Sequence, residues 1–415
     1  MNSHQYIRSF DDLDFVAQRS ERLLTLFSGG LDSTYILKEL SRKNSCEVIA
    51  LTVDLGDGVN LEDICALTAR FAATSIVIDG QERFARDAVL PALRCNARYM
   101  SMYPISASLS RPIICQFAVD LARQKGCDAI IHTANQSQNS LRRINGALAQ
   151  LGFKGFFGSP YEYSAVSREQ KIEELGNIGL DKFSARGTSG DSNLWCREFE
   201  SGSLDNPEAF HAPENLFDWS VTQAPAGAVG TVSVTFREGV PVALDGVDMS
   251  LVELIAQANR RVGSFGIGRF AGLEHLERGE KVLEVREAPA AHLLMDAYRH
   301  LETASLDSEL LREKLSLEQI WVREAVEGRW FGNLRIAAEQ FIKETAKQIS
   351  GVVQYKLRAG SADVCSICAT EPLYLTDRDA WERETARGRG SRSLRSMHKS
   401  GPTIHVGQSN LVEAE

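Results

Sequence analysis

One nine-residue stretch combines hydroxyl, glycine and acidic residues in an order that suits phosphate binding. Residues 26–34 read Leu-Phe-Ser-Gly-Gly-Leu-Asp-Ser-Thr and continue an apolar run that begins at Leu23. The two glycines let backbone approach a phosphate without a Cβ, and amides at the start of a following helix point at the anion. The hydroxyls of Ser28, Ser33 and Thr34 add donors. The stretch predicts a strand, a phosphate-binding turn and a helix; an ordinary glycine turn before a helix is the alternative.

The loop lacks the Gly-Lys-Ser/Thr ending of a Walker loop, which argues against a kinase-type or GTPase-type site. Residues 28–33 resemble instead the pyrophosphatase (PP) loop of enzymes that split ATP between its α and β phosphates and transfer AMP to an oxygen. Asp32 is expected to order the loop or a Mg²⁺ ion near the phosphates, to cap the following helix, or to do both.

The segments around this loop predict an α/β domain with a doubly wound parallel sheet, because strand-like and helix-like stretches alternate. The expected strands cover residues 23–27, 47–53, 74–79 and 128–132, and the expected helices cover 61–71 and 108–123. Ligands of such sheets bind beyond the carboxyl ends of the strands. Loops 28–34, 54–59 and 133–140 should therefore meet at one site.

The chain divides into three expected parts. Residues 1–165 form the PP-loop ATP-binding domain. Residues 166–370 mix β-rich segments such as 231–236 with helical segments such as 331–350, which predicts an α+β synthetase domain. Residues 371–415 turn basic and rich in glycine and serine around 387–392, so we expect a tail or oligomerisation arm rather than an RNA-binding segment.

Composition excludes several classes of function. The net charge of −9 argues against broad nucleic-acid binding, and no apolar run reaches the ~20 residues of a membrane span. The amino-terminal residues lack the apolar core of a signal peptide, and eight scattered cysteines suggest no disulfide framework. We therefore expect a cytoplasmic protein. Cys365 and Cys368 form half of a metal-site pattern with no second pair nearby, so no protein-bound metal is expected.

Several separate motifs, in one order, resemble the argininosuccinate synthase family from the PP-loop to about residue 370. The motifs are Ser28-Gly-Gly-Leu-Asp32, Asp54-Leu-Gly56, Tyr99-x-x-x-Tyr103, Ser108-Leu-Ser-Arg-Pro112, His132-x-Ala134, Asn139-x-x-x-Arg143, Ser189-x-Asp191-x-Asn193-Leu194, Glu200-x-Gly202-x-Leu204-x-x-Pro207 and Phe265-Gly-Ile-Gly-Arg269. The resemblance implies a Mg²⁺- and ATP-dependent ligase that adenylylates a ureido oxygen and joins the substrate to an amine, releasing pyrophosphate and AMP. It also implies small amino-acid-like substrates and a homo-oligomer, a tetramer or a dimer.

The same resemblance implies the site residues. The ATP site comprises Leu26, Phe27, Ser28, Gly29, Gly30, Leu31, Asp32, Ser33, Thr34, Ala50, His132 and Ala134. Ser28, Asp32 and Arg143 are the implied catalytic residues, and the spacing from Asn139 favours Arg143 over Arg142. His132 is expected to be structural rather than a proton carrier. The implied substrate residues are Tyr99, Asn135, Asn139, Ser140, Arg143, Ser189, Glu198, Glu274 and Arg286.

Departures from the family pattern bear on the substrates. Glu198 replaces a serine of the family and Arg286 replaces a tyrosine. These two charged side chains should pair with each other, or both should bind a zwitterionic end of a new substrate. The alternative is that both lie in solvent at the rim of the pocket. The family's aspartate site uses a threonine, the shared asparagine and an acidic residue, and the chain has Asn135, Asn139 and Ser140 there. A lysine of the family loop is also missing, with Ser137 in its place. We therefore expect altered substrates in a specialised pathway. The alternatives are genuine argininosuccinate synthesis, an RNA-modifying PP-loop enzyme and a non-catalytic binding paralogue.

Overall fold

The computed structural model describes residues 5–42, 46–56, 58–183 and 188–387. Contacts divide the chain into one compact unit up to Pro372 and a second from Leu373 onward. The described part of the second unit carries a helix, α13 (Arg378–Arg387), on which Trp381 is exposed. Of the basic stretch expected at 387–392, the residues after Arg387 lie outside the described residues, so its role as an arm stays a prediction.

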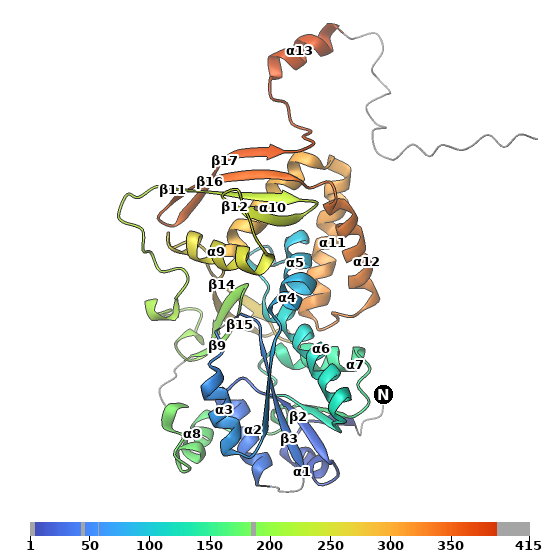
Figure 1. The fold of residues 1–415 in the computed structure, drawn as a ribbon, viewed down its shortest axis with the longest axis vertical. Helices are drawn as coiled ribbons and strands as arrows, with labels where there is room; N and C mark the ends of the chain where they lie inside the picture. Colours follow the sequence, from blue (N-terminus) through green and yellow to red (C-terminus); the bar gives the residue numbers. More distant parts are fainter. Residues whose placement is uncertain (1–4, 43–45, 57, 184–187, 388–415) are drawn as a thin grey trace, which may run out of the picture. The chain divides into compact units, whose positions relative to one another are not determined.

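The amino-terminal half contains a six-stranded sheet whose strands all run parallel (Figure 1). Its order is β1 (Tyr6–Ile7), β8 (Phe156–Gly158), β7 (Ala129–Ile131), β2 (Arg22–Leu26), β3 (Glu47–Asp54) and β4 (Thr74–Asp79). The predicted doubly wound sheet is confirmed. Strand β2 lies between β3 on one side and β7 on the other, and the strand order reverses direction at this point. The loops after β2 and β7 therefore leave the sheet side by side, at the position where such folds bind ligands.

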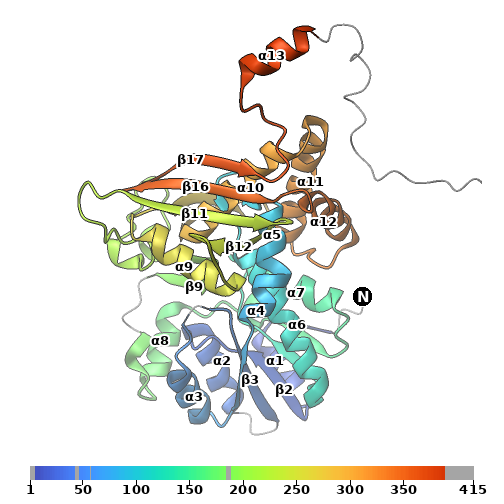
Figure 2. The ribbon, with the colours of Figure 1, turned by 45° about the horizontal axis from the view of Figure 1, so that its top comes forward.

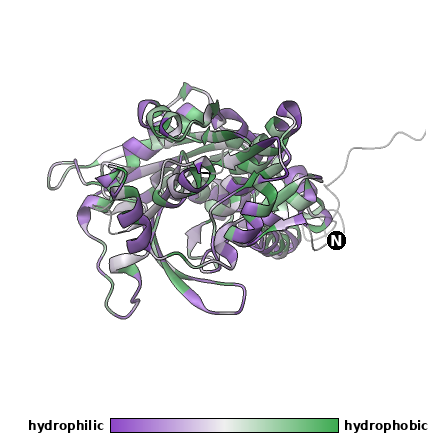
Figure 3. Cartoon of the chain, turned by 90° about the horizontal axis from the view of Figure 1, so that it is seen from below, coloured by the Kyte–Doolittle hydropathy of each residue, from purple (hydrophilic) through white to green (hydrophobic). Residues whose placement is uncertain are grey.

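Helices cover both faces of this sheet. One face packs on α1 (Phe10–Ala17), α2 (Leu31–Ser41), α3 (Leu61–Arg70) and α8 (Arg168–Gly176), and the other on α6 (Ala107–Lys125) and α7 (Ser140–Gln150). The residues of α8 fall in the expected second domain, yet the helix contacts α2. Figure 3 shows hydrophobic and hydrophilic stretches alternating along the helices, as one-sided burial requires.

Beyond residue 188 the first unit is built from antiparallel sheets and helices, which confirms the α+β expectation (Figure 2). The four-stranded sheet has the order β14 (Arg269–His275), β15 (Lys281–Glu287), β10 (Cys196–Glu200), β9 (Ser189–Asn193). The five-stranded sheet has the order β13 (Val247–Asp248), β12 (Val240–Leu244), β11 (Gly230–Arg237), β16 (Gly351–Arg358), β17 (Ser361–Ala369). The helices are α9 (Leu251–Gly263), α10 (Pro289–Ser305), α11 (Ser308–Val326) and α12 (Asn333–Ala346).

Short elements from residue 81 to 104 join the two halves. Helices α4 (Gln81–Phe84) and α5 (Leu90–Arg94) flank a π-helical turn, and the hairpin of β5 (Arg98–Tyr99) and β6 (Tyr103–Pro104) follows. Residues of these elements belong to the same hydrophobic core as α9 to α12.

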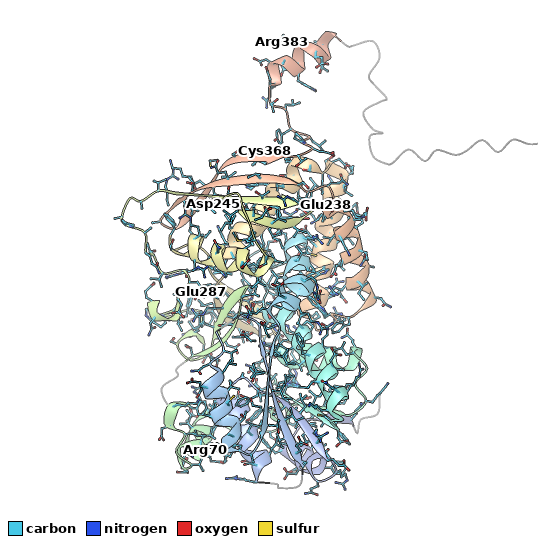
Figure 4. All side chains as sticks on the ribbon, viewed as in Figure 1. Arg70, Glu238, Asp245, Glu287, Cys368 and Arg383 are labelled. Carbon is cyan, nitrogen blue, oxygen red and sulfur yellow. The ribbon has the colours of Figure 1, made fainter. Side chains whose placement is uncertain are left out.

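Two further expectations concern membranes and metals. Within the described residues, no helix combines the length and apolarity needed to cross a membrane. Cys365 and Cys368 are exposed on β17, where Figure 4 labels Cys368. Across the ranges given above, no group of three or more His, Cys, Asp or Glu side chains is placed to hold a metal ion.

Candidate active site

A cavity of about 390 Å³ opens at the carboxyl ends of β2 and β7. Its wall combines the loop after β2, the loop after β7, the start of α7 and the first two turns of α6 with strands β9, β10 and β15. The parallel sheet thus contributes one side of the cavity and the four-stranded sheet the other. This volume lies within the range of small-molecule sites.

The loop after β2 has the backbone geometry that an anion-binding turn requires. Gly29 has φ +71°, and a Cβ there would lie 2.9 Å from Ile64 Cδ1, so the turn requires glycine. Gly30 is the N-cap of α2 without any side-chain cap, which leaves the first helical amides open to a ligand. A Cβ on Gly30 would meet only Ser28 Oγ, at 3.2 Å, so the space beside its backbone is open. These features fit a phosphate group.

Asp32 lies in the first turn of α2 and lines the cavity. Because Gly30 is the N-cap, the expectation that Asp32 caps the helix is wrong. Its carboxylate instead pairs with Lys171 of α8, with Oδ1 and Nζ 2.7 Å apart. An acidic residue is also favourable in a first helical turn, since it faces the positive end of the helix dipole.

His132 directly follows β7 and has the structural contacts that the sequence suggests. Its Nδ1 accepts a hydrogen bond from the Ala134 amide (3.3 Å), so Nε2 carries the proton and donates to Asn145 Oδ1 (2.9 Å). Burial lowers the pKa of His132 to about 4, which leaves the imidazole neutral near pH 7. The ring is neutral and both of its nitrogens are engaged in hydrogen bonds, so His132 orders the loop after β7.

A buried carboxylate joins two arginines beside the cavity. Glu274 is 1% exposed, and its Oε1 accepts from Arg143 Nη2 (2.5 Å) and Asn139 Nδ2 (2.8 Å). Its Oε2 lies 3.2 Å from Arg286 Nη2. Burial alone would raise the pKa of Glu274, but the charges of Arg143 and Arg286 outweigh it and lower the pKa to about 2. Glu274 therefore stays ionised and fixes both arginines.

Arg286 in turn contacts three carboxylates. It pairs with Glu198 (2.6 Å), with Glu274 and with Glu284, and it lies 4.2 Å from the centre of the Tyr103 ring. Glu198 and Arg286 face each other as partners in the β10–β15 register. Direct pairing is thus confirmed, and the solvated-rim alternative is wrong because both side chains are buried.

The cavity brings together most of the residues expected from the sequence. Those that line it are Leu26, Phe27, Ser28, Gly30, Leu31, Asp32, Ser33, His132, Ala134, Asn139, Ser140, Arg143, Ser189 and Glu198. Gly29, Thr34, Ala50, Tyr99, Asn135, Glu274 and Arg286 do not line it. Ala50 and Thr34 are fully buried behind the wall.

Tyr99 and Asn135 make contacts within the protein. The Tyr99 hydroxyl lies 2.6 Å from His275 Nδ1, and its ring stacks on Tyr103. Asn135 Oδ1 accepts from the amide and hydroxyl of Ser137. Both residues order neighbouring segments of the site, and direct substrate contact by either stays a prediction.

Other lining residues were not singled out from the sequence. Arg111 pairs with Asp191 (2.9 Å) and donates to Ser140 Oγ (3.1 Å). Arg111 and Asp191 both belong to motifs quoted above, so the sequence could have indicated them as site residues. Glu284 and Arg168 also line the cavity, and they belong to none of those motifs.

Glu284 should give the folding stability a distinctive pH dependence. Burial raises its pKa from 4.5 to about 8, so between these values the folded state holds a proton that the unfolded state has released. The free energy of unfolding should therefore fall as pH rises through this window, by at most about 1.4 kcal/mol per pH unit. We expect Glu284→Gln to flatten the decline in urea unfolding measured from pH 5 to 8. Glu344→Gln, at an exposed position of α12, should leave the slope unchanged. An unchanged slope in Glu284→Gln would contradict the assignment.

Comparison with known proteins places these features in a family. The amino-terminal HUP domain model of argininosuccinate synthase matches residues 22–177, and the carboxyl-terminal domain model matches residues 188–390. Argininosuccinate synthase of Dictyoglomus thermophilum is 34% identical over 86% of this chain and 90% of its own length. That of Oceanobacillus iheyensis is 34% identical over 89% of this chain and 90% of its own length. An NH₃-dependent NAD synthetase of Campylobacter jejuni aligns with 41% of this chain and 72% of its own at 19% identity and a TM-score of 0.29, too weak a likeness to carry weight. The two family models together span most of the sequence, and the chain belongs to the argininosuccinate synthase family.

Proposed function

We propose that this chain, a carbon–nitrogen ligase, uses ATP to join citrulline to aspartate, with release of pyrophosphate and AMP. The observation that supports it most is that the phosphate cradle and the residues Asn139, Arg143 and Ser189 line the same cavity. An adenylylated oxygen and an incoming amine could therefore meet there. The relatives reported above carry the same activity in their names, which favours this pair of substrates over altered ones.

The residues present suit a reaction that is driven by positioning and electrostatics. The open amides of α2 would bind phosphate oxygens, and Arg143, held by Glu274, would face the activated substrate. Mg²⁺, bound with ATP, would supply neutralising charge at the phosphates. Asp32 is the acidic side chain of the cradle that could face such an ion. From the family we further propose a cytoplasmic homo-oligomer.

A second candidate is a ligase of the same type with altered substrates. The pair between Glu198 and Arg286 replaces two neutral residues of the family pattern and supports this candidate. Ser140 supports it too, since it offers a hydroxyl where a carboxylate would meet the ammonium of aspartate. A hydrogen bond to a charged group contributes about 1.5–3 kcal/mol, or about ten- to a hundredfold in affinity.

Pyrophosphate release with a panel of amines separates the two candidates. We expect citrulline with aspartate to give the highest turnover, with a KM for aspartate in the ordinary micromolar-to-millimolar range. Ser140→Asp should lower that KM because it adds a carboxylate beside the amine, whereas Ser140→Asn, of similar size, should not. If another amine, or another ureido substrate, is used faster, the altered-substrate candidate stands and the proposal falls.

A further inference from the structure

We propose that helix α8 completes the pyrophosphate end of the ATP site, with Arg168 contacting the phosphates and Lys171 positioning Asp32. This rests on the proposed use of ATP. Neither residue belongs to the motifs that identify the phosphate loop, and α8 lies more than 130 residues further along the chain. The contacts of α8 with the loop carry the inference.

Lys171 is held against the loop on two sides. It is 7% exposed, its Nζ lies 2.7 Å from Asp32 Oδ1, and the same nitrogen lies 4.2 Å from the centre of the Tyr161 ring. The Tyr161 hydroxyl donates to the backbone oxygen of Asp32 at 3.2 Å. The carboxylate of Asp32 is therefore fixed by α8, and its peptide by the segment that leads into α8.

Arg168 stands one helical turn before Lys171. Residues three apart share a helix face, so both side chains project on the side of α8 that meets the loop. Arg168 lines the cavity together with Ser28, Gly30 and Asp32. A guanidinium on this wall can bind phosphate oxygens in a forked geometry.

Helix α8 is anchored firmly enough to hold these charges in place. Glu174, one turn after Lys171, pairs with the buried Lys38 of α2 and accepts from the Tyr35 hydroxyl at 3.2 Å. Glu174 thus ties α8 to the helix that begins at the phosphate loop. Charges on two elements fixed to each other need little rearrangement when the nucleotide binds.

The pairing of Lys171 with Asp32 has a consequence for nucleotide binding. Asp32 lines the cradle, so an unpaired carboxylate there would repel the triphosphate. Lys171 offsets this repulsion before any cation arrives. When Mg²⁺ accompanies ATP, the ion can take over part of this role, so the need for Lys171 should depend on Mg²⁺.

Calorimetric titration with an ATP analogue that carries a methylene bridge between the α and β phosphates tests the proposal. In EDTA we expect Lys171→Met to raise the Kd at least about tenfold. With saturating Mg²⁺ the rise should be smaller. Adding Asp32→Asn to Lys171→Met should recover most of the affinity in EDTA, because it removes the unpaired carboxylate. Lys171→Arg should bind like the unchanged protein.

Arg168→Gln gives an independent arm of the test. It should raise the Kd for the analogue with and without Mg²⁺ but leave the Kd for AMP, which lacks the outer phosphates, unchanged. Lys347→Met, which removes a lysine paired with Glu344 at the exposed end of α12, is the matched control and should change neither. If Lys171→Met does not fold by circular dichroism, Lys171→Gln repeats the comparison with the charge removed and a hydrogen bond kept.

The outcomes separate this inference from the proposed function. An unchanged Kd in EDTA for the Lys171 variant, or equal losses for AMP and the analogue in the Arg168 variant, would overturn the inference while ATP use stands. Failure of the unchanged protein to bind the analogue at all would overturn the proposed function itself.

Discussion

Gly30→Val is expected to lower pyrophosphate release at least about a hundredfold while leaving the fold intact. The backbone of Gly30 has φ −78° and ψ 174°, which a β-branched residue can adopt, and its Cβ would meet only Ser28 Oγ. The added methyl groups would then fill the space where the first amides of α2 receive a phosphate. Losses of this order follow when a single preorganised donor is removed from a charged transition state. The measurement is pyrophosphate release under saturating ATP and substrates, with circular dichroism to verify folding.

Gly332→Val is the matched control for this experiment. Gly332 is also a glycine N-cap without a side-chain cap, on α12, with φ −74° and ψ 145°. If valine at such an N-cap position destabilises the fold in general, Gly332→Val should lower the folding stability but retain turnover. Near-normal turnover in Gly30→Val would show that phosphate does not bind against this residue.

Asp32→Ala should also abolish pyrophosphate release, since it removes the acidic side chain of the phosphate-binding loop.

Arg286→Tyr is expected to lower the free energy of unfolding by about 3–5 kcal/mol, the usual cost of breaking a buried ion pair. The guanidinium contacts Glu198, Glu274 and Glu284, and its removal leaves Glu198 and Glu284 without their arginine. Glu198→Ser should cost less, because Arg286 keeps the ionised Glu274 and because burial already raises the pKa of Glu198. Urea unfolding at pH 7 measures both changes.

The variant that combines both substitutions tests whether Glu198 and Arg286 are energetically coupled. Glu198→Ser with Arg286→Tyr should be milder than Arg286→Tyr alone, because one stranded carboxylate is gone. Costs that add within about 0.5 kcal/mol would contradict direct coupling. Arg358→Met is the control: it breaks an exposed cross-strand pair with Asp363 and should cost about 1 kcal/mol or less.

Local signals in the sequence were enough to predict the strands that build the site. Strands β2, β3, β4 and β7 fall within a residue or two of the apolar runs that predicted them, since buried parallel strands are continuously apolar. Strands β1 and β8 span two and three residues, too few for any pattern. The position of β1 at the edge of the sheet, and of β8 between β1 and β7, depends on tertiary pairing alone.

For the candidate site, local sequence signals predict only part of the arrangement. The family resemblance includes Gly30, Asn139 and Arg143, and these line the cavity because each lies in a loop or first turn whose position follows from the sheet. It placed Tyr99, Glu274 and Arg286 near a substrate, but whether a side chain lines a cavity or lies behind its wall depends on packing between distant strands and helices. The ion pair between Lys171 and Asp32 joins residues that are 139 positions apart in the sequence, so no local pattern predicts it.

The charges on β10 and β15 also specify how these two strands align while the protein folds. Glu198 lies opposite Arg286, and the next pair along the strands is Arg197 opposite Glu287, a fully buried residue that Figure 4 labels. Sliding one strand by a single residue would set Arg197 against Arg286, and sliding it the other way would set Glu198 against Glu287. Like charges opposite each other are unfavourable, and a one-residue slip also turns each side chain to the wrong face. Two adjacent pairs of opposite polarity therefore discriminate against both one-residue shifts of these strands.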